Sequence, residues 1–499
     1  MLSRKYYYHT ESDKKLWSHV GEGSHHARVD RILDGEDRQS RSTMRVRILN
    51  ANTLWLIGLL VLAQWAVRLL FEHGVAPLPS SGLPFRPQSG TLTFVIGVLI
   101  TALAGAILPP KIESVVGAAV WMLFILLVMP GWVLMHSMGE ERVLLPFILV
   151  VVGPIVMLGA MARSVPSSPL GRVPQLSRQV SSLMAAGACV FTALVVWATG
   201  DIDLSLEAVY ERRLEVRDGP DGVLVYLAFW VEHAVVPVTL IVSLCARRWG
   251  LALSALVMSA CPYLIYGSKL ALLWPLVLVG WWVVRSVGLV SAAGFVGLLT
   301  AALWGAVALG SVWVNDYIVR RSLCVPPSLT FVYLVEWEVR RPMLWRDSPL
   351  IAQVLHGTPP DPPLGRVVGE EILGRRDLNA SVDVFTNGFA EGWYPGVCLV
   401  GVAGLAVLLI IERICRRLGQ GVAALIGLHV GMILSIQPLH SAMMSGGLLA
   451  LGLLLWWCGR GTVAHPAQAS QCAPECVEGE GPRHQSRYGG TAVGPQRTA

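Results

Sequence analysis

The chain has 499 residues, of which 54% are hydrophobic and only 14% are charged, and its formal net charge is +6. A soluble domain carries about 25% charged residues, so this composition excludes a large soluble protein with an ordinary charged surface. Apolar runs long enough to cross the hydrocarbon core of a bilayer, about 17–25 residues each, recur along the sequence. The composition therefore predicts an all-α, polytopic integral membrane protein.

The two termini differ in composition from the rest of the chain. Residues 1–50 are polar and basic and lack the apolar core of a secretory signal peptide. They are expected to form a disordered cytoplasmic tail, or else translation starts at Met44, and both alternatives stay open. Residues 459–499 are polar and rich in small residues, which predicts a second disordered cytoplasmic tail.

Between the tails, apolar windows predict about twelve transmembrane helices, within residues 51–311 and 395–458. The predicted spans are 53–71, 91–109, 115–136, 142–161, 180–200, 223–245, 250–266, 270–285, 288–311, 395–411, 420–437 and 441–458. The remaining segment, 312–394, is the only long connection, and it is rich in aromatic residues. A loop of this length in a compact protein is usually functional or disordered, and its aromatic residues favour a function.

The short connections indicate how the helices are oriented. Basic residues concentrate on alternate connections, as the excess of lysine and arginine in cytoplasmic loops predicts. They are Lys111, Arg163, Arg172, Arg178, Arg247, Arg248, Arg285, Arg413, Arg416 and Arg417. Because both basic termini fall on the same side, both are predicted to be cytoplasmic, and 312–394 is predicted to be an extracytoplasmic loop that carries short helices.

The end of this loop, Asn379–Gly396, reads NASVDVFTNGFAEGWYPG and repeats three kinds of residue at every fourth position. In a helix each such step turns the side chain by only about 40°, so each kind would form a stripe. The stripes are Asp383, Asn387 and Glu391; Gly388, Gly392 and Gly396; and Phe385, Phe389 and Trp393. The polar stripe predicts side chains that face a cavity or the protein interior, where a carboxylate can bind a sugar hydroxyl or act as a base. The alternative is that these acids only cap the next span.

Three basic residues near the predicted outer face are candidates for binding an anion such as a diphosphate. Lys269 lies at the outer ends of two short apolar segments, although a lysine whose stem follows the membrane boundary explains this position equally well. Arg320 and Arg321 follow the end of a predicted span, and a guanidinium group matches the geometry of phosphate oxygens. No Walker, GxGxxG, HExxH or Ser/His/Asp signature is present, and neither a metal, a cofactor nor a nucleic-acid partner is expected.

The order of these features resembles the bacterial O-antigen polymerases, also called oligosaccharide repeat-unit polymerases. The resemblance covers about residues 262–460, and four stretches carry it: GSKLALLWPLVLV, VRRSLCVPPSLTFVYLVEW, PPDPPLG and NASVDVFTNGFAEGWYPGVCLVG. It implies a GT-C-like glycosyltransferase at the outer face of the bacterial cytoplasmic membrane. Such an enzyme transfers a glycan from a polyprenyl diphosphate to a fresh lipid-linked repeat unit. A chain-length regulator protein is an expected partner.

The candidate residues fit roles in the chemistry that the resemblance implies. Lys269, Arg320 and Arg321 would stabilise the departing diphosphate, Asp383 or Glu391 would be the base, and Asn379, Asn387, Tyr333, Trp337 and Trp393 would bind the sugars. The family's pairing of an aromatic residue with glycine is interrupted here by Tyr394-Pro395, which affects the expected local backbone geometry. The alternatives are an O-antigen ligase-type transferase, a lipid-linked oligosaccharide transporter or flippase, and a structural partner in a polysaccharide assembly complex.

Overall fold

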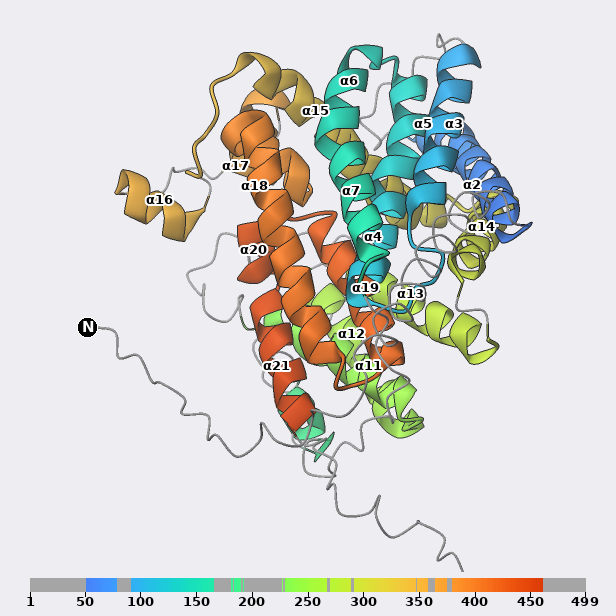
Figure 1. Cartoon of the computed structure of the whole chain (residues 1–499), viewed down its shortest axis with the longest axis vertical. Helices are drawn as coiled ribbons and strands as arrows, with labels where there is room; N and C mark the ends of the chain where they lie inside the picture. The colour runs from blue at the N-terminus through green and yellow to red at the C-terminus, as the bar shows by residue number, and fades with distance from the viewer. Residues whose placement is uncertain are drawn as a thin grey trace, which may run out of the picture. The chain divides into compact units, whose positions relative to one another are not determined.

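The computed structural model describes residues 51–78, 91–165, 181–182, 184–189, 192, 227, 229–266, 270–288, 291–346, 348–357, 364–374 and 379–460. These residues form helices and their connections, so the described part of the chain has the all-helical architecture that the sequence predicts (Figure 1). The predicted tails, apart from residues 459 and 460, lie outside the described residues.

The helices follow in chain order, and η marks a 3-10 or π-helical turn. They are α2 (Ala51–Leu69), η3 (Leu70–Val75), α3 (Thr91–Ile107), α4 (Val115–Leu123), η4 (Phe124–Val128), α5 (Met129–Met138), η5 (Glu141–Val143), α6 (Leu144–Phe147), η6 (Ile148–Val152), α7 (Gly153–Ala162), η7 (Val231–Val235), α11 (Val236–Cys245), α12 (Trp249–Tyr266), α13 (Leu270–Ser286), α14 (Ala292–Leu309), η8 (Val314–Cys324), α15 (Val325–Val339), α16 (Pro349–His356), α17 (Leu364–Val367), η9 (Val368–Ile372), α18 (Val384–Cys415), α19 (Gln420–Leu434), α20 (Leu439–Met443) and α21 (Leu448–Arg460).

Seven of the described helices are long and apolar enough to cross a membrane. They are Ala51–Val75, Val115–Met138, Leu144–Ala162, Ala292–Leu309, Val314–Val339, Val384–Cys415 and Leu439–Gly459, and shorter apolar helices accompany them. Every predicted span overlaps one of these helices except 180–200, most of which lies outside the described residues. A polytopic membrane protein therefore fits the structure, while the number of helices that cross a membrane stays a prediction.

The helix Val115–Met138 lies at the centre of the bundle, because the whole of its apolar window is buried by other helices. Helix α19 packs closely against its first part, α4. A Cβ atom placed at Gly431 would lie 2.6 Å from the carbonyl oxygen of Ala119, and one at Gly427 would lie 2.6 Å from the Cβ of Ala118. Two glycines four residues apart thus allow this close contact, as small residues do between membrane helices.

Connections that are far apart in the sequence meet at one end of the bundle. Arg163 Nη2 donates a hydrogen bond of 3.0 Å to the carbonyl of Leu108, which joins the end of α7 to the end of α3. Lys111 forms a β-bridge with Ser291, which joins the connection between α3 and α4 to the start of α14. Three predicted cytoplasmic connections therefore lie together.

Other predicted cytoplasmic connections reach the same end. The N–H of Val115 donates to Glu412 Oε2 over 2.5 Å, so the end of α18 lies beside the start of α4. A Cβ at Gly421 would lie 3.4 Å from both Cys245 Sγ and Arg285 Cζ, which places the ends of α11 and α13 at the start of α19. We call this the basic end; it comprises residues 106–115, 162–165, 245–248, 285–288, 291 and 412–421. The side of a membrane that it faces stays a prediction.

The helix formed by η8 and α15, Val314–Val339, lies at the opposite end of the bundle. It contacts α5 and α6, and the helices to which α5 and α6 belong have their other ends at the basic end. In Figure 1 it runs behind α5 and α6. The sequence predicts only short helices within 312–394, and a 26-residue helix was not expected there. Its polar first part, VNDYIVRRSLC, is the reason, because it interrupts the apolar pattern from which spans are predicted.

Candidate functional site

The candidate site is formed at the opposite end by two elements: the η8–α15 helix and the first two turns of α18. These elements pack against each other, and the three members of the predicted polar stripe are buried between them and their neighbours. Asp383 is 1% exposed, Asn387 is 2% exposed and Glu391 is fully buried. The prediction that this stripe faces the protein interior is therefore confirmed.

Asp383 is the N-cap of α18 and links α18 to α15. Its Oδ1 accepts hydrogen bonds from the N–H groups of Phe385 (2.9 Å) and Thr386 (3.0 Å), two donors that the first turn of a helix leaves without intrahelical partners. Its Oδ2 accepts a hydrogen bond of 3.0 Å from the hydroxyl of Thr330 on α15. Burial raises the pKa of the Asp383 carboxyl, and these hydrogen bonds oppose that shift because they stabilise the anion. The capping role left open by the sequence is thus the role that the geometry gives Asp383.

Glu391 lies where α18 breaks, and a loop from another part of the chain closes over it. The N–H of Met343 donates to the carbonyl of Ala390 over 3.0 Å, and that of Leu344 donates to the carbonyl of Glu391 over 2.9 Å. The N–H of Trp345 donates to the Glu391 carboxylate itself, through Oε2. Leu344 and Trp345 adopt the left-handed backbone conformation, with φ of 53° and 64°. Such strained positions persist only where surrounding contacts fix them, and they concentrate at functional sites.

The stretch from Asp383 to Gly396 is not one straight helix, in contrast to the arrangement of stripes that the spacing suggests. Gly392 and Trp393 have non-helical backbone angles, and Pro395 follows in the first turn of the second segment. A Cβ at Gly396 would collide with the carbonyl oxygen of Gly388. The small residues do permit a close approach, but the approaching backbone is the other segment of α18 itself. Tyr394-Pro395 therefore marks a real break.

The aromatic residues predicted to bind sugars have different surroundings. Tyr333 and Trp337 are each 1% exposed and stack on one another with ring centroids 5.0 Å apart. The Tyr333 hydroxyl donates to the carbonyl of Ala380 over 2.9 Å. Trp393 is 43% exposed, and its Nε1 donates to the carbonyl of Trp337 over 3.1 Å. Of the three, Trp393 alone has a ring that offers substantial surface to a ligand.

Two of the three predicted cationic residues, Arg320 and Arg321, lie on the same helix as Thr330 but nearer its start. Arg320 is 6% exposed and forms an ion pair of 2.5 Å with Asp316, and Arg321 is partly buried. Ten residues of helix separate Arg320 from Thr330, which corresponds to about 15 Å along the axis. Arg320 therefore shares a helix with the partner of Asp383 without lying directly beside it. Lys269 lies outside the described residues.

The two asparagines are placed differently from each other. Asn387 lies in the buried first segment of α18, whereas Asn379 is exposed. The side chain of Asn379 fills the space beside Gly365, and the N–H of Ala380 donates to the Gly365 carbonyl over 2.8 Å. Among the residues that the structure describes, no group of three or more histidine, cysteine or acidic side chains is arranged to hold a metal ion.

Sequence reasoning missed Thr330 and the loop Met343–Trp345 as parts of this site. Thr330 is 53 residues from Asp383 in the sequence, and Trp345 is 46 residues from Glu391. The only local signal was Pro342, which ends the α15 region before the loop, and it does not indicate what the loop contacts. Comparison with protein-family models gave no match, and comparisons with curated proteins and with solved structures found no similar chain.

Proposed function

We propose that the chain is a membrane-embedded glycosyltransferase that polymerises lipid-linked oligosaccharide repeat units at the opposite end of the bundle. The donor is a glycan on a polyprenyl diphosphate, and the acceptor is a sugar hydroxyl of another lipid-linked repeat unit. This end corresponds to the outer face of a bacterial cytoplasmic membrane if the basic end is cytoplasmic, as the distribution of basic residues predicts.

One observation carries the proposal: Asp383, Glu391 and Arg320, all of which carry ionisable side chains, are buried at the same end of the bundle. Burial alone does not identify a functional acid, since Glu412 at the basic end is buried as well. Glu391, however, also lies at the break in α18, beneath a loop with two left-handed residues, and such strained positions concentrate at functional sites. The resemblance of residues 262–460 to repeat-unit polymerases suggests that Asp383, Glu391 and Arg320 take part in glycosyl transfer from a lipid diphosphate.

In the proposed reaction, the acceptor hydroxyl attacks the anomeric carbon of the donor glycan. The new glycosidic C–O bond forms as the bond between that carbon and the diphosphate oxygen breaks, and the hydroxyl proton passes to a carboxylate. Glu391 is the better candidate for this base, because three hydrogen bonds already hold Asp383 as a helix cap. Arg320, Arg321 and Lys269 are the candidates that stabilise the charge on the departing diphosphate.

The test uses a strain that lacks the chromosomal gene, complemented with full-length variants, and a gel of its surface glycan. Glu391→Gln and Arg320→Gln should give single-repeat products in place of a ladder, with the protein still in the membrane. Glu338→Gln is the matched control, because Glu338 is an exposed carboxylate on α15. Wild-type chain lengths in both test variants would remove the assignment, and complete loss of surface glycan in the gene deletion would indicate a ligase or a flippase.

A further inference from the structure

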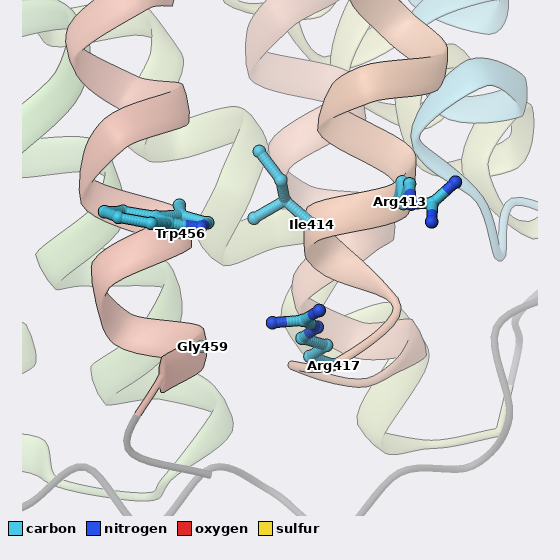
Figure 2. A pocket seen from close by; sticks show the side chains of 5 residues that line it. All are labelled: Arg413, Ile414, Arg417, Trp456 and Gly459. Atoms are coloured by element: carbon cyan, nitrogen blue, oxygen red, sulfur yellow. The ribbon is translucent and has the colours of Figure 1, made fainter. Parts of the chain in front are cut away.

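A groove lies at the basic end, between the ends of α18 and α21. Arg413, Ile414, Arg417, Trp456 and Gly459 line it, and it encloses about 190 Å³ (Figure 2). In Figure 2 the guanidinium group of Arg417 lies between the two helices, whereas Arg413 extends from the other side of α18. The aliphatic stem of Arg417 lies over Gly459. A Cβ placed at Gly459 would lie 3.8 Å from both Cβ and Cδ of Arg417.

Two arginines give the groove positive charge that no carboxylate among the described residues pairs with. Arg413 and Arg417 are both exposed, and within the described part of the chain neither forms an ion pair with a carboxylate. Arg416, one residue away, does have such a partner, because it lies 3.8 Å from Glu412. An anion entering the groove would therefore meet a guanidinium group that is free to bind phosphate oxygens.

Further from the C-terminal ends of α18 and α21, next to the groove, the surface is apolar. Ile410 on α18 is 60% exposed and Leu453 on α21 is 58% exposed. Trp456, which is 42% exposed, lines the groove level with Ile414, and therefore lies between Arg417 and the apolar surface along the helices (Figure 2). Trp457 follows it in α21 and is 41% exposed. Tryptophan is enriched at the boundary between lipid and water. The succession of cation, tryptophan and aliphatic surface matches the succession of phosphate, glycerol and acyl chain in a phospholipid.

We propose that this groove binds an anionic phospholipid. Its phosphate lies against Arg417, with Arg413 adding to the local positive potential, and its acyl chains lie along Ile410 and Leu453. Basic pockets between membrane helices on the cytoplasmic side bind anionic headgroups in this way. A zwitterionic lipid is bound more weakly, because its headgroup brings a second positive charge next to the arginines.

The full-length protein, purified in a mild detergent, is titrated with phosphatidylglycerol or phosphatidylcholine, and bound lipid is counted by native mass spectrometry. Wild type should retain phosphatidylglycerol roughly fivefold to tenfold better than phosphatidylcholine. Arg417→Gln should lose roughly fivefold of that affinity, and the double variant with Arg413→Gln should lose more. Arg416→Gln removes the same charge one residue away and should bind as wild type.

Three results would overturn the proposal. Equal retention of the two lipids by wild type would overturn it. This comparison needs no variant, so it remains valid even if a variant misfolds. An equal loss in Arg416→Gln and Arg417→Gln would show a general charge effect in place of a site. Displacement of phosphatidylglycerol by inorganic phosphate at millimolar concentration would assign the groove to a free anion.

Discussion

The two ends of α18 both contain a buried carboxylate, but the two carboxylates have partners of different kinds. Near the start of α18, the Glu391 carboxylate accepts a hydrogen bond from a backbone N–H of the strained loop Met343–Trp345. Near its end, Glu412 is 1% exposed, accepts a hydrogen bond from the first N–H of α4 and lies 3.8 Å from Arg416. The partners of Glu412 are thus the start of another helix and a cation.

This difference shows that burial alone does not identify a functional acid. Glu412 has the partners of a structural group, because it joins the central helix to α18. Glu391 lies at a backbone break, under a loop in which two non-glycine residues are left-handed. We therefore expect substitutions at Glu412 to change stability and a conservative substitution at Glu391 to change activity.

The largest effect is expected where the first segment of α18 meets the second. Gly396→Leu places a side chain against the carbonyl of Gly388, so the two segments must separate. The free energy of unfolding should fall by about 3 kcal/mol, measured by thermal unfolding of the purified protein. Gly452→Leu in α21 is the control, because a Cβ there meets nothing within 4 Å. Equal destabilisation by the two variants would contradict the close contact within α18.

At the basic end, Glu412→Ala should lower the free energy of unfolding by about 2 kcal/mol, because it leaves the buried N–H of Val115 without its acceptor. Arg416→Gln should cost less than about 1 kcal/mol, since the Arg416 side chain is 41% exposed and solvent screens its ion pair. Chemical denaturation of both variants in one detergent compares them. If the two losses are the same, the ion pair and not the helix contact stabilises this end.

Two substitutions at Asp383 distinguish a role as helix cap from a role as the catalytic base. Asp383→Ala should cost about 1–2 kcal/mol of stability, whereas Asp383→Asn keeps a good N-cap and should cost little. Glycan chain length in the complemented strain should stay near wild type in Asp383→Asn if Glu391 is the base. Single-repeat products from a stable Asp383→Asn protein would instead assign the base to Asp383.

The smallest effect is expected at the surface of the site. Trp393→Phe removes the hydrogen bond from Nε1 to the carbonyl of Trp337 and should cost about 0.5–1.5 kcal/mol of stability. The ring remains, so a sugar that stacks on it should still bind, and chain length should not change. Trp393→Ala should shorten the chains, and gels of the two variants run side by side would distinguish ring stacking from the hydrogen bond.

Part of the site could be predicted from the sequence. The four-residue spacing of Asp383, Asn387 and Glu391 indicated correctly that all three are buried, because the first segment of α18 is helical through Glu391. Beyond that residue the same spacing was misleading. The glycines that would form a stripe on a straight helix instead allow the bent helix to contact itself at Gly388 and Gly396.

The sequence by itself determined the apolar helices and the grouping of the basic connections. A membrane helix forms its backbone hydrogen bonds within itself, along an apolar run long enough to cross the bilayer. Both requirements depend on consecutive residues, so the local sequence reveals them. Only the tertiary structure decided the partners of the carboxylates, the break in α18 and the course of Val314–Val339. These features depend on contacts such as Thr330 with Asp383, 53 residues apart, and no local pattern encodes which distant groups will meet.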